Sequence, residues 1–373
     1  MDVPVKKQSA NILGLSYQEL KCLLEELGQP EFRARQVFHA LYKERVATLE
    51  DVSTLPKSLP PEMGKRGIFF SSPTIERKFV SVDGTIRYLI AFDDGQSVET
   101  VWMPEGDGGE AGDGSVAGEE ELPANRKSFD RATICVSSQV GCAVNCQFCM
   151  TALLGLKRNL SAGEIVGQII TVLNDHHVDM ERQRINLVFM GQGEPFNNYE
   201  NFIKAVNLLV EGVGFAESRM TVSTSGIVPR IYDLAKEKVR PKLAISLNAS
   251  NDEQRTKLIP INKKWNIAAL LEAARAFPLR TRERLTFEYV LLDQEIDSPQ
   301  DAEEVAKMVN NLRAKVNLIA LNSGPEIVIA MPSNERVLAF QRTLLDAGVP
   351  AFIRRPRGRD IYAACGQLKR TVA

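Results

Sequence analysis

Histidine, tryptophan and long apolar runs are scarce in this chain. The 373 residues include three histidines, His39, His176 and His177, and two tryptophans. Two of the histidines are adjacent in the polar stretch NDHHVDMERQ. We read this stretch as a solvated loop, which makes histidine catalysis a poor hypothesis. No stretch reaches the roughly eighteen consecutive apolar residues that a membrane-spanning helix needs, and the N-terminus lacks the apolar core of a signal peptide. We therefore expect a cytoplasmic protein with no membrane partner.

The chain also lacks an excess of charge of either sign. Its formal net charge is -1, with 44% hydrophobic and 25% charged residues, which is typical of soluble globular proteins. This balance argues at first against a nucleic-acid partner. However, residues 105–122 contain seven acidic residues and no basic one, so the rest of the chain carries a charge of +6. Arg354, Arg355, Arg357 and Arg359 suit phosphate contacts, with a solvated charged edge as the alternative.

The hydrophobic pattern divides the chain into four parts. Residues 1–65 contain two amphipathic helical patterns and predict a small helical domain. Residues 66–104 contain short apolar runs separated by Asp-Gly turn signals, which predict a small antiparallel β extension. Residues 105–128 are acidic and rich in glycine, which predicts an exposed loop. Residues 129–373 alternate strand-like and helical windows, which predicts an α/β parallel sheet, either open or curled toward a barrel.

Six cysteines are too few for a disulfide scaffold at this length, and four of them lie within fifteen residues. Cys142, Cys146 and Cys149 form a C-x3-C-x2-C pattern just after the first strand expected in the α/β region. Three closely spaced thiolates suit an iron–sulfur cluster, and an odd number of ligands leaves one iron open to another molecule. The residues alone leave two alternatives to a cluster. In the first, Cys135 is a fourth ligand of a zinc ion; in the second, the cysteines are free packing residues.

The cysteine pattern includes Phe148 as an aromatic residue and resembles the motif of the radical S-adenosylmethionine (SAM) superfamily. Longer stretches resemble the RlmN family of dual-specificity RNA methyltransferases: CVSSQVGCAVNCQFCMTALLGLKRNLSAGEI, MGQGEP, STSGIVP, INKKWNI and RPRGRDIYAACGQL. This resemblance implies a partial (β/α) barrel of the radical SAM type. It also implies methylation of carbon 2 of adenine in 23S rRNA, at the peptidyl-transferase centre, and in tRNA, 3′ of the anticodon. We expect a monomer served by a cellular electron donor such as flavodoxin.

Family membership would give the helical domain an RNA-binding role. Arg33, Arg35 and Lys43 lie among the polar positions of its second helical pattern. With the C-terminal arginines, they are our candidates for the positive surface that an almost neutral chain needs to hold a polyanion.

The resemblance also implies the residues that hold the cofactors. Cys142, Cys146 and Cys149 would bind a [4Fe-4S] cluster whose open iron takes SAM. The implied SAM contacts each follow an expected strand: Gly193, Glu194, Ser223, Ser246, Leu247, Asn248 and Asn322. Position 248 departs from the family, in which many members carry histidine, although asparagine still forms hydrogen bonds. From the residues alone, GQGE is a tight turn and Ser223 a helix cap.

Three further residues match catalytic positions of the family. Cys365 would carry the methyl group, Cys135 would be its redox partner in a transient disulfide, and Glu99 would accept a proton. The family uses two SAM molecules per turnover. One methylates Cys365 by displacement, and the other yields the radical that lets the carried methyl group add to the electron-poor carbon 2 of adenine. From the residues alone, Cys365 is a buried small residue and Glu99 a surface carboxylate.

Three other functions compete with this one. A carbon-8 adenine methyltransferase of the antibiotic-resistance type shares the cysteine loop and the cysteine pair, but Pro195 and the stretch MTALLGLKRNL favour carbon 2. A radical SAM enzyme for a peptide or small molecule generally needs no methyl-carrying cysteine, so Cys135 and Cys365 argue against it. The third alternative is a zinc-stabilised RNA-binding module, which iron content distinguishes from the enzyme.

Overall fold

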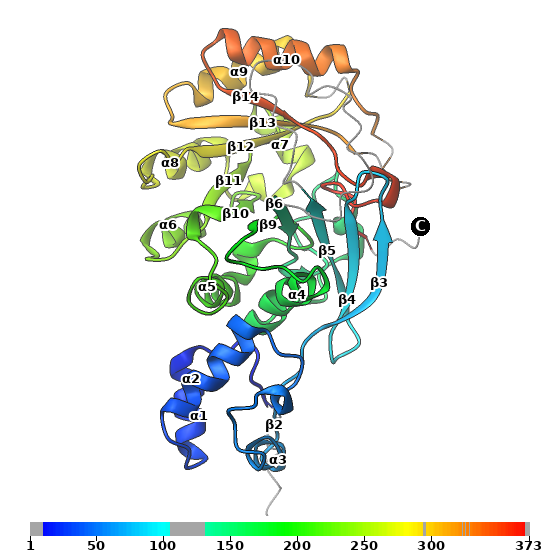
Figure 1. Cartoon of the computed structure of the whole chain (residues 1–373). Coiled ribbons are helices and arrows are strands. Elements are labelled where there is room, and N and C mark those ends of the chain that lie inside the picture. Colours follow the sequence, from blue (N-terminus) through cyan, green and yellow to red (C-terminus); the bar gives the residue numbers. More distant parts are fainter. Residues whose placement is uncertain are drawn as a thin grey trace, which may run out of the picture.

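The computed structural model describes residues 10–104 and 131–369, apart from 294, 295, 323, 325 and 328. The acidic loop expected at 105–128 lies outside these residues. Figure 1 shows a small helical part at one end of the molecule and a large sheet with helices packed along it. Within the described ranges, no helix is long and apolar enough to cross a membrane.

The N-terminal part is helical, as predicted. Its helices are α1 (Tyr17–Glu26), α2 (Phe32–His39), which continues as the π-helix η1 (Ala40–Glu44), and α3 (Leu59–Lys65). α1 begins at a capping box in which the Ser16 hydroxyl accepts from the Glu19 backbone N–H, and it ends before Gly28, which has φ +68°. The boundary near residue 65 differs in one detail. β2 (Ile68–Phe69) pairs in parallel with β1 (Ala10–Asn11) rather than joining the β extension.

The main sheet has ten strands in the order β14-β13-β12-β11-β10-β9-β6-β5-β4-β3. These strands are β3 (Thr74–Val80), β4 (Ile86–Ala91), β5 (Ser97–Pro104), β6 (Arg131–Cys135), β9 (Arg184–Phe189), β10 (Met220–Thr224), β11 (Lys242–Ser246), β12 (Leu285–Leu291), β13 (Ala314–Ala320) and β14 (Ala351–Arg354). The larger helices between them are α4 (Ala162–Asp175), α5 (Tyr199–Leu208), α6 (Val228–Lys236), α7 (Asp252–Leu258), α8 (Ile267–Ala276), α9 (Pro299–Val309) and α10 (Asn334–Asp346).

The strand order explains why the α/β region forms a partial barrel. From β6 through β9 to β14 every neighbouring pair is parallel, and the strands follow one another in sequence order. Right-handed crossovers in a single direction place the connecting helices on one face and leave the other face concave. Figure 1 accordingly shows α5, α6 and α8 along one side of the strands and the C-terminal segment on the other.

The predicted antiparallel extension is present, and it is continuous with the main sheet. β3, β4 and β5 form an antiparallel meander, and β5 pairs with β6 so that Val101 lies directly opposite Cys135. Side chains on directly paired residues share a face of the sheet. The extension therefore adds a wall to the concave face beside Cys135 instead of forming a separate sheet.

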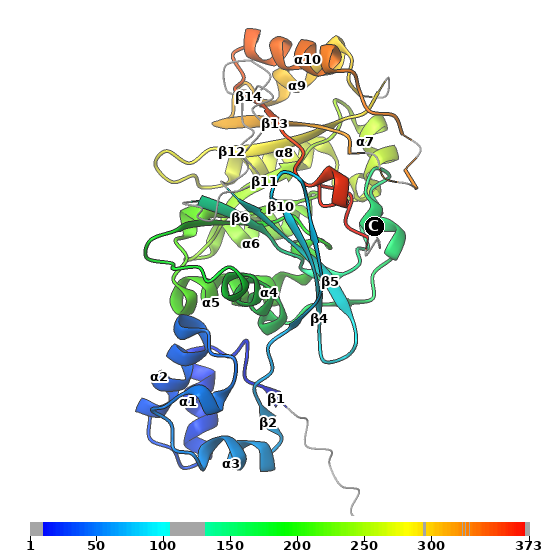
Figure 2. The ribbon, with the colours of Figure 1, turned by 45° about the vertical axis from the view of Figure 1, so that its right-hand side comes forward.

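The N-terminal domain packs against the start of α4, below the sheet in Figure 2. A Cβ at Gly163 would lie 2.1 Å from the Leu13 carbonyl oxygen, and one at Gly14 would lie 2.5 Å from the Gly163 nitrogen. Glycine is thus required where the two backbones meet. The Tyr42 hydroxyl accepts from the Gly14 backbone N–H and donates to the Leu15 carbonyl, which fixes the entering strand against the helical domain.

His176 is not in a solvated loop, contrary to the interpretation of NDHHVDMERQ. Its ring stacks on Trp102 with centroids 3.9 Å apart, and its Nε2 lies 2.8 Å from the Tyr88 hydroxyl. Burial lowers the pKa of His176 to about 4, opposed by the nearby Asp175 carboxylate. This residue therefore ties the end of α4 to the β extension as a neutral imidazole.

The depressed pKa of His176 predicts a loss of stability in acid. The unfolded chain takes up a proton near pH 6.5, whereas the folded chain does so only near pH 4, so the free energy of unfolding should fall as pH drops through this interval. His176→Phe keeps the stacking and removes the titration, so its urea-unfolding free energy should fall less steeply from pH 6.5 to 4. His177→Asn, which changes an exposed neighbour, should behave as the unchanged protein does. Equal slopes for all three proteins would contradict this assignment.

Candidate active site

The cysteine loop runs from β7 (Gln139–Val140) to the 3-10 helix η3 (Met150–Leu154), beyond the carboxyl end of β6. β7 pairs with β8 (Arg158–Asn159), which closes the base of the loop. At this base Gly141 has φ +78°, and a Cβ there would lie 1.7 Å from the Gly155 carbonyl oxygen. Only glycine permits this approach, so the loop containing the three cysteines has a narrow, fixed neck.

Two further contacts hold the cysteine loop against distant parts of the chain. The Gln147 backbone N–H donates to the Leu258 carbonyl at the end of α7 at 3.0 Å. The Met150 backbone N–H donates to the Gly366 carbonyl at 2.7 Å, next to Cys365. The loop and the C-terminal cysteine are therefore positioned by direct backbone bonding.

Burial raises the pKa of each thiol in the loop: that of Cys142 to about 12, and those of Cys146 and Cys149 upward as well. At Cys142 and Cys146, repulsion from neighbouring acidic groups adds to this effect, whereas hydrogen bonds with Thr151 oppose it at Cys149. Three buried thiolates need a positively charged partner, and an iron–sulfur core supplies that charge.

The three cysteines line one cavity at the carboxyl edge of the parallel strands. The structure brings most of the expected SAM contacts to the same cavity: Gly193, Glu194, Ser223, Ser246, Asn248 and Asn322. Leu247 differs, because its side chain is fully buried and does not line the cavity. The Asn322 Oδ1 is buried without a hydrogen-bond partner in the described chain, so an acceptor is available to a ligand in this cavity.

The GQGE sequence forms a tight turn, and that turn places Glu194 on the cavity wall. Gly193 has φ +97°, and a Cβ there would lie 2.5 Å from the Gln139 side chain. The two Glu194 oxygens accept from the backbone N–H groups of Phe196 at 3.1 Å and Ser225 at 2.7 Å. Burial raises the pKa of Glu194 while these hydrogen bonds oppose the rise. The carboxylate thus joins two strand-end loops.

Glu288 was missed by the sequence analysis. It lies on β12, and its Oε2 accepts from the Ser223 hydroxyl at 2.6 Å, with the Ser246 hydroxyl 3.4 Å from that of Ser223. Ser223 is therefore not a helix cap, and α6 begins instead after Ile227. A single carboxylate inside the apolar run LTFEYVLL is the signal that marks an inward-facing polar residue.

Asn248, where the sequence departs from the family resemblance, has a defined structural role. Its backbone has φ +52°, a conformation that asparagine adopts more readily than most residues. Its Oδ1 accepts from the Val290 backbone N–H at 2.8 Å, which fixes the end of β12.

A second cavity adjoins the first and contains the cysteine pair. Cys135 lines only this second cavity, while Cys365 lines both. Its other lining residues include Met103, Met190, Glu288, Arg354, Arg355 and Arg357. Cys365 is exposed toward these cavities, so its interpretation as a buried packing residue is wrong.

All six cysteines are free thiols, so Cys135 and Cys365 are separate in this structure. Surrounding protein raises the pKa of Cys365 to about 11, with Glu288 adding to the shift and Arg354 opposing it. Burial also raises the pKa of Cys135, and the electrostatic effect of Cys365 adds to it. The two thiols therefore share one cavity, and the pKa of each lies above the usual value for a thiol.

Glu99 is buried, with 1% of its surface exposed, so its interpretation as a surface carboxylate is wrong. It forms an ion pair with Arg87, and the Gln192 Nε2 donates to its Oε2 at 3.1 Å. It shares a strand face with Val101, which is paired with Cys135, but it lines neither cavity. Glu99 thus lies on the face of β5 that also carries Val101, within its own network of Arg87 and Gln192.

The arrangement of the cysteines distinguishes a cluster from zinc. Within the part of the chain that the structure describes, no three His, Cys, Asp or Glu side chains are placed to hold one metal ion. Zinc needs ligands that converge to within about 2.3 Å of a single point. A [4Fe-4S] cluster needs thiolates that surround a cavity, because each binds a different iron. The cavity lined by Cys142, Cys146 and Cys149 fits a cluster, and Cys135, which a zinc site would need as its fourth ligand, lies outside this cavity.

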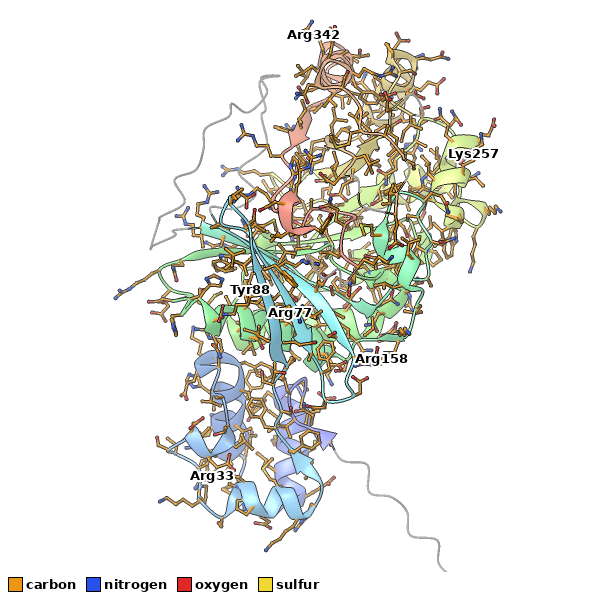
Figure 3. The ribbon with its side chains drawn as sticks, turned by 90° about the vertical axis from the view of Figure 1, so that its right-hand side faces the viewer. Arg33, Arg77, Tyr88, Arg158, Lys257 and Arg342 are labelled. Carbon is orange, nitrogen blue, oxygen red and sulfur yellow. The ribbon has the colours of Figure 1, made fainter. Side chains whose placement is uncertain are left out.

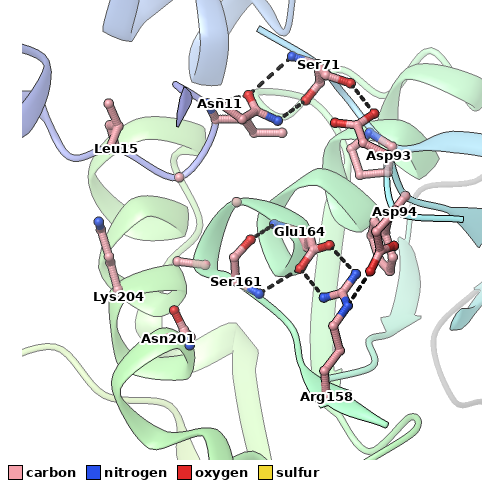
Figure 4. Close-up of a pocket in the computed structure, with 16 residues that line it drawn as sticks. Asn11, Leu15, Ser71, Asp93, Asp94, Arg158, Ser161, Glu164, Asn201 and Lys204 are labelled. Carbon is pink, nitrogen blue, oxygen red and sulfur yellow. Dashed lines mark hydrogen bonds and ion pairs between the residues drawn. The ribbon is translucent and has the colours of Figure 1, made fainter. Parts of the chain in front are cut away.

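A larger cavity, of about 490 Å³, lies where the N-terminal domain meets α4. Figure 4 shows Arg158 held between Asp94 and Glu164, at Nε–O and Nη2–O distances of 2.6 and 2.7 Å, beside the Ser161 cap of α4. No cysteine lines this cavity, and its other charged groups also have partners: Lys204 pairs with Glu19 at 2.7 Å, and Asp93 accepts from the Ser71 hydroxyl at 2.8 Å. It is a domain junction, and the chemistry belongs to the two smaller cavities.

Comparison with known proteins agrees with this site. The radical SAM superfamily model matches residues 136–309, and the model of the ribosomal RNA large subunit methyltransferase N-terminal domain matches residues 10–66. A protein of Koribacter versatilis (strain Ellin345), described as a probable dual-specificity RNA methyltransferase RlmN, is 64% identical over 348 residues, covering 93% of this chain and 98% of the relative. The dual-specificity RNA methyltransferase RlmN of Campylobacter jejuni subsp. jejuni serotype O:2 is 44% identical over 357 residues, covering 94% and 96%.

Structural similarity extends over the same length. A crystal structure of a radical SAM methyltransferase from Sphaerobacter thermophilus superposes with a TM-score of 0.85 at 41% identity, covering 96% of this chain and 99% of that one. Sequence, fold and the cysteine-lined cavity therefore agree, and the chain belongs to the RlmN family of radical SAM RNA methyltransferases.

Proposed function

We propose that this enzyme methylates carbon 2 of adenine in 23S rRNA and tRNA, with Cys365 as the methyl carrier. The observation that carries this proposal is the position of Cys365, which lines both the cavity of the three loop cysteines and the cavity of Cys135. A sulfur in this position is able to take a methyl group from SAM on one side and present it to a base on the other.

The first cavity suits SAM beside a cluster held by Cys142, Cys146 and Cys149. The bound cluster would supply the electron that cleaves SAM to a 5′-deoxyadenosyl radical, and an electron donor such as flavodoxin would first reduce the cluster. Glu194 and Asn322 present oxygen acceptors on the cavity wall for the amino and hydroxyl groups of SAM.

The division of labour between the thiols follows from their positions. Cys365 attacks the methyl group of a first SAM and releases S-adenosylhomocysteine, for which its thiol must lose a proton. The 5′-deoxyadenosyl radical removes one hydrogen atom from the carried methyl group, and the resulting carbon radical adds to adenine and joins the RNA to the Cys365 sulfur. The adduct must then lose its unpaired electron, for which the oxidised cluster would be the acceptor. Cys135 then attacks that sulfur, which forms a Cys135–Cys365 disulfide and releases the methylated RNA. Glu99, held by Arg87 and Gln192 near Cys135, is our proposed acceptor of the adenine ring proton.

The nucleoside product tests this function. Anaerobically reconstituted enzyme, SAM and a reductant are incubated with unmodified 23S rRNA and with unmodified tRNA, and the nucleosides are identified by mass spectrometry against synthetic standards. We expect 2-methyladenosine from both RNAs. Recovery of 8-methyladenosine, the product of the resistance-type enzyme, would overturn the assignment to carbon 2.

The basic residues proposed to bind RNA have different environments. Arg354 and Arg355 line the second cavity, where an adenine would enter. Arg357 is buried and paired with Asp83, with an N–O distance of 3.2 Å, so it is a structural residue rather than a phosphate contact. Arg33 is half-buried and bonded through Nη1 to the Thr54 carbonyl at 2.7 Å, so it also stabilises the helical domain.

Arg35 and Lys43 are exposed on the helical domain and are better tests of RNA binding. Replacing both with Gln should raise the RNA dissociation constant several-fold and reduce its logarithmic salt slope by about 1 to 2, because phosphate contacts release counterions. SAM cleavage without RNA should be unchanged. Lys257→Gln with Arg342→Gln removes the same charge from the opposite end of the molecule, where Figure 3 places these residues, and should leave RNA affinity unchanged. If both double variants have the same RNA dissociation constant and the same salt slope, the helical domain does not bind RNA through these residues.

A further inference from the structure

Arg255, on α7, is fully buried. Its guanidinium donates to the Leu247 carbonyl at 2.9 Å, the Ser246 carbonyl at 2.9 Å, the Ser225 carbonyl at 2.7 Å and the Asn262 Oδ1 at 2.8 Å. All four acceptors are neutral oxygens. The side chain therefore joins the loops that follow β10 and β11, and its positive charge has no carboxylate within hydrogen-bond distance in the described chain.

The other buried arginines of the described chain are all paired. Arg87 contacts Glu99, Arg240 contacts Glu283 at 2.8 Å, and Arg357 contacts Asp83 at 3.2 Å. Burying a charge without an opposite charge costs several kcal/mol, so pairing is the usual arrangement. Among these buried arginines of the described chain, only Arg255 has no ion pair. Its positive charge therefore needs a negatively charged partner that the side chains touching it do not supply.

The position of Arg255 identifies this partner. Ser225 and Ser246, whose carbonyls it contacts, line the cavity that also contains Cys146. The end of its own helix is bonded to the cysteine loop through Gln147. Burial lowers the pKa of Arg255 to about 10, and the two groups whose negative charge opposes this shift are Cys146 and Asp252. The guanidinium thus contacts the backbone of two residues that line the same cavity as Cys146.

We propose that Arg255 is the fixed counter-charge of the iron–sulfur cluster and raises its reduction potential. This inference rests on the proposed function, because it requires the cluster to be held by the three loop cysteines. Three thiolates more than offset the charge of the oxidised core, and reduction adds one further negative charge. A buried cation nearby stabilises the reduced state more than the oxidised state, since electrostatic interactions are strong at low dielectric. Arg255 is therefore a positioning residue that acts through its field.

The test is the midpoint potential of the cluster, measured by redox titration followed by electron paramagnetic resonance on the fraction of protein that carries iron. Arg255→Gln removes the charge and should shift the potential to more negative values. Arg240→Gln is the matched control. It also removes a buried arginine, but from the amino end of β11, opposite the cavity, so its potential should equal that of the unchanged protein.

A second variant keeps Arg255 and all of its contacts. Asp252→Asn removes the nearest opposing carboxylate, while the amide oxygen still accepts from the Ile267 N–H and the Asn262 Nδ2. It should shift the potential to more positive values. The proposal is overturned if the midpoint potential of Arg255→Gln equals that of the unchanged protein. If Arg255→Gln holds no iron and cannot be titrated, an unchanged midpoint potential in Asp252→Asn overturns the proposal instead. Failure of the unchanged protein to bind a cluster would instead contradict the proposed function itself.

Discussion

Cys146→Ala is expected to reduce the iron content of the reconstituted enzyme from about four atoms per chain to near zero and to abolish SAM cleavage. Cys146 lines the cavity together with Cys142 and Cys149. The loop that contains all three cysteines is fixed at its base by Gly141. Each thiolate binds a different iron, so neither of the others replaces it. Iron analysis and the yield of 5′-deoxyadenosine measure the two losses.

The matched control is Cys22→Ala, which removes an exposed thiol on α1 in the helical domain. This variant should keep full iron content and activity. Full SAM cleavage by the Cys146→Ala protein would contradict the assignment of the cluster to this loop.

Cys135→Ala is expected to trap RNA covalently on the enzyme. In the proposed sequence of steps, Cys365 joins the RNA through the carried carbon, and Cys135 is the thiol that releases it. Cys135 lies in the second cavity with Cys365 and is buried there, so no solvent thiol takes its place readily. Denaturing electrophoresis should show a protein–RNA band in Cys135→Ala after turnover and none in the unchanged enzyme.

The attachment point is tested by the double variant Cys135→Ala with Cys365→Ala, which should form no adduct. Peptide mapping of the single variant should place the modified nucleoside on Cys365. An equal yield of adduct in the double variant would show that the RNA is attached elsewhere and that Cys365 is not the methyl carrier.

The sequence predicted the local elements of this fold well because their signals are local. The Ser16 cap with Glu19 marks the start of α1, and the apolar runs at 185–190 and 285–292 mark buried strands. Parallel strands whose carboxyl ends meet at one edge also explain why polar residues after separate strands, such as Glu194 and Ser246, line one cavity.

Other features depend on distant contacts that no local pattern encodes. The β extension joins the main sheet through the pairing of Val101 with Cys135, across the segment 105–130. His176 stands in a polar stretch, yet Trp102 covers its ring. Two-residue strands such as β1 and β2 are too short to produce an alternating pattern.

The same limit applies to charged residues of the site. Arg255 lies in the polar segment 251–257, whose composition is typical of exposed positions, and Glu99 lies in the short strand β5, yet both are buried. Their burial depends on partners far along the chain, Gln192 for the first and Ser225 for the second. A charged residue within a buried strand, such as Glu288, is the clearest sequence signal of an inward-facing polar group. The same signal predicts residues of the cavity wall in related chains.

In the proposed reaction, the methyl group reaches RNA through Cys365 and loses one hydrogen atom on the way. The direct test supplies the unchanged enzyme with SAM whose methyl group carries three deuterium atoms and measures the mass of the methyladenosine formed after several turnovers. We expect a product methyl group with two deuterium atoms and one hydrogen, because one deuterium is removed from the methyl group carried by Cys365 before the carbon adds to adenine. A product that retains all three deuterium atoms would mean direct transfer from SAM to RNA and would contradict the role of Cys365 as the methyl carrier.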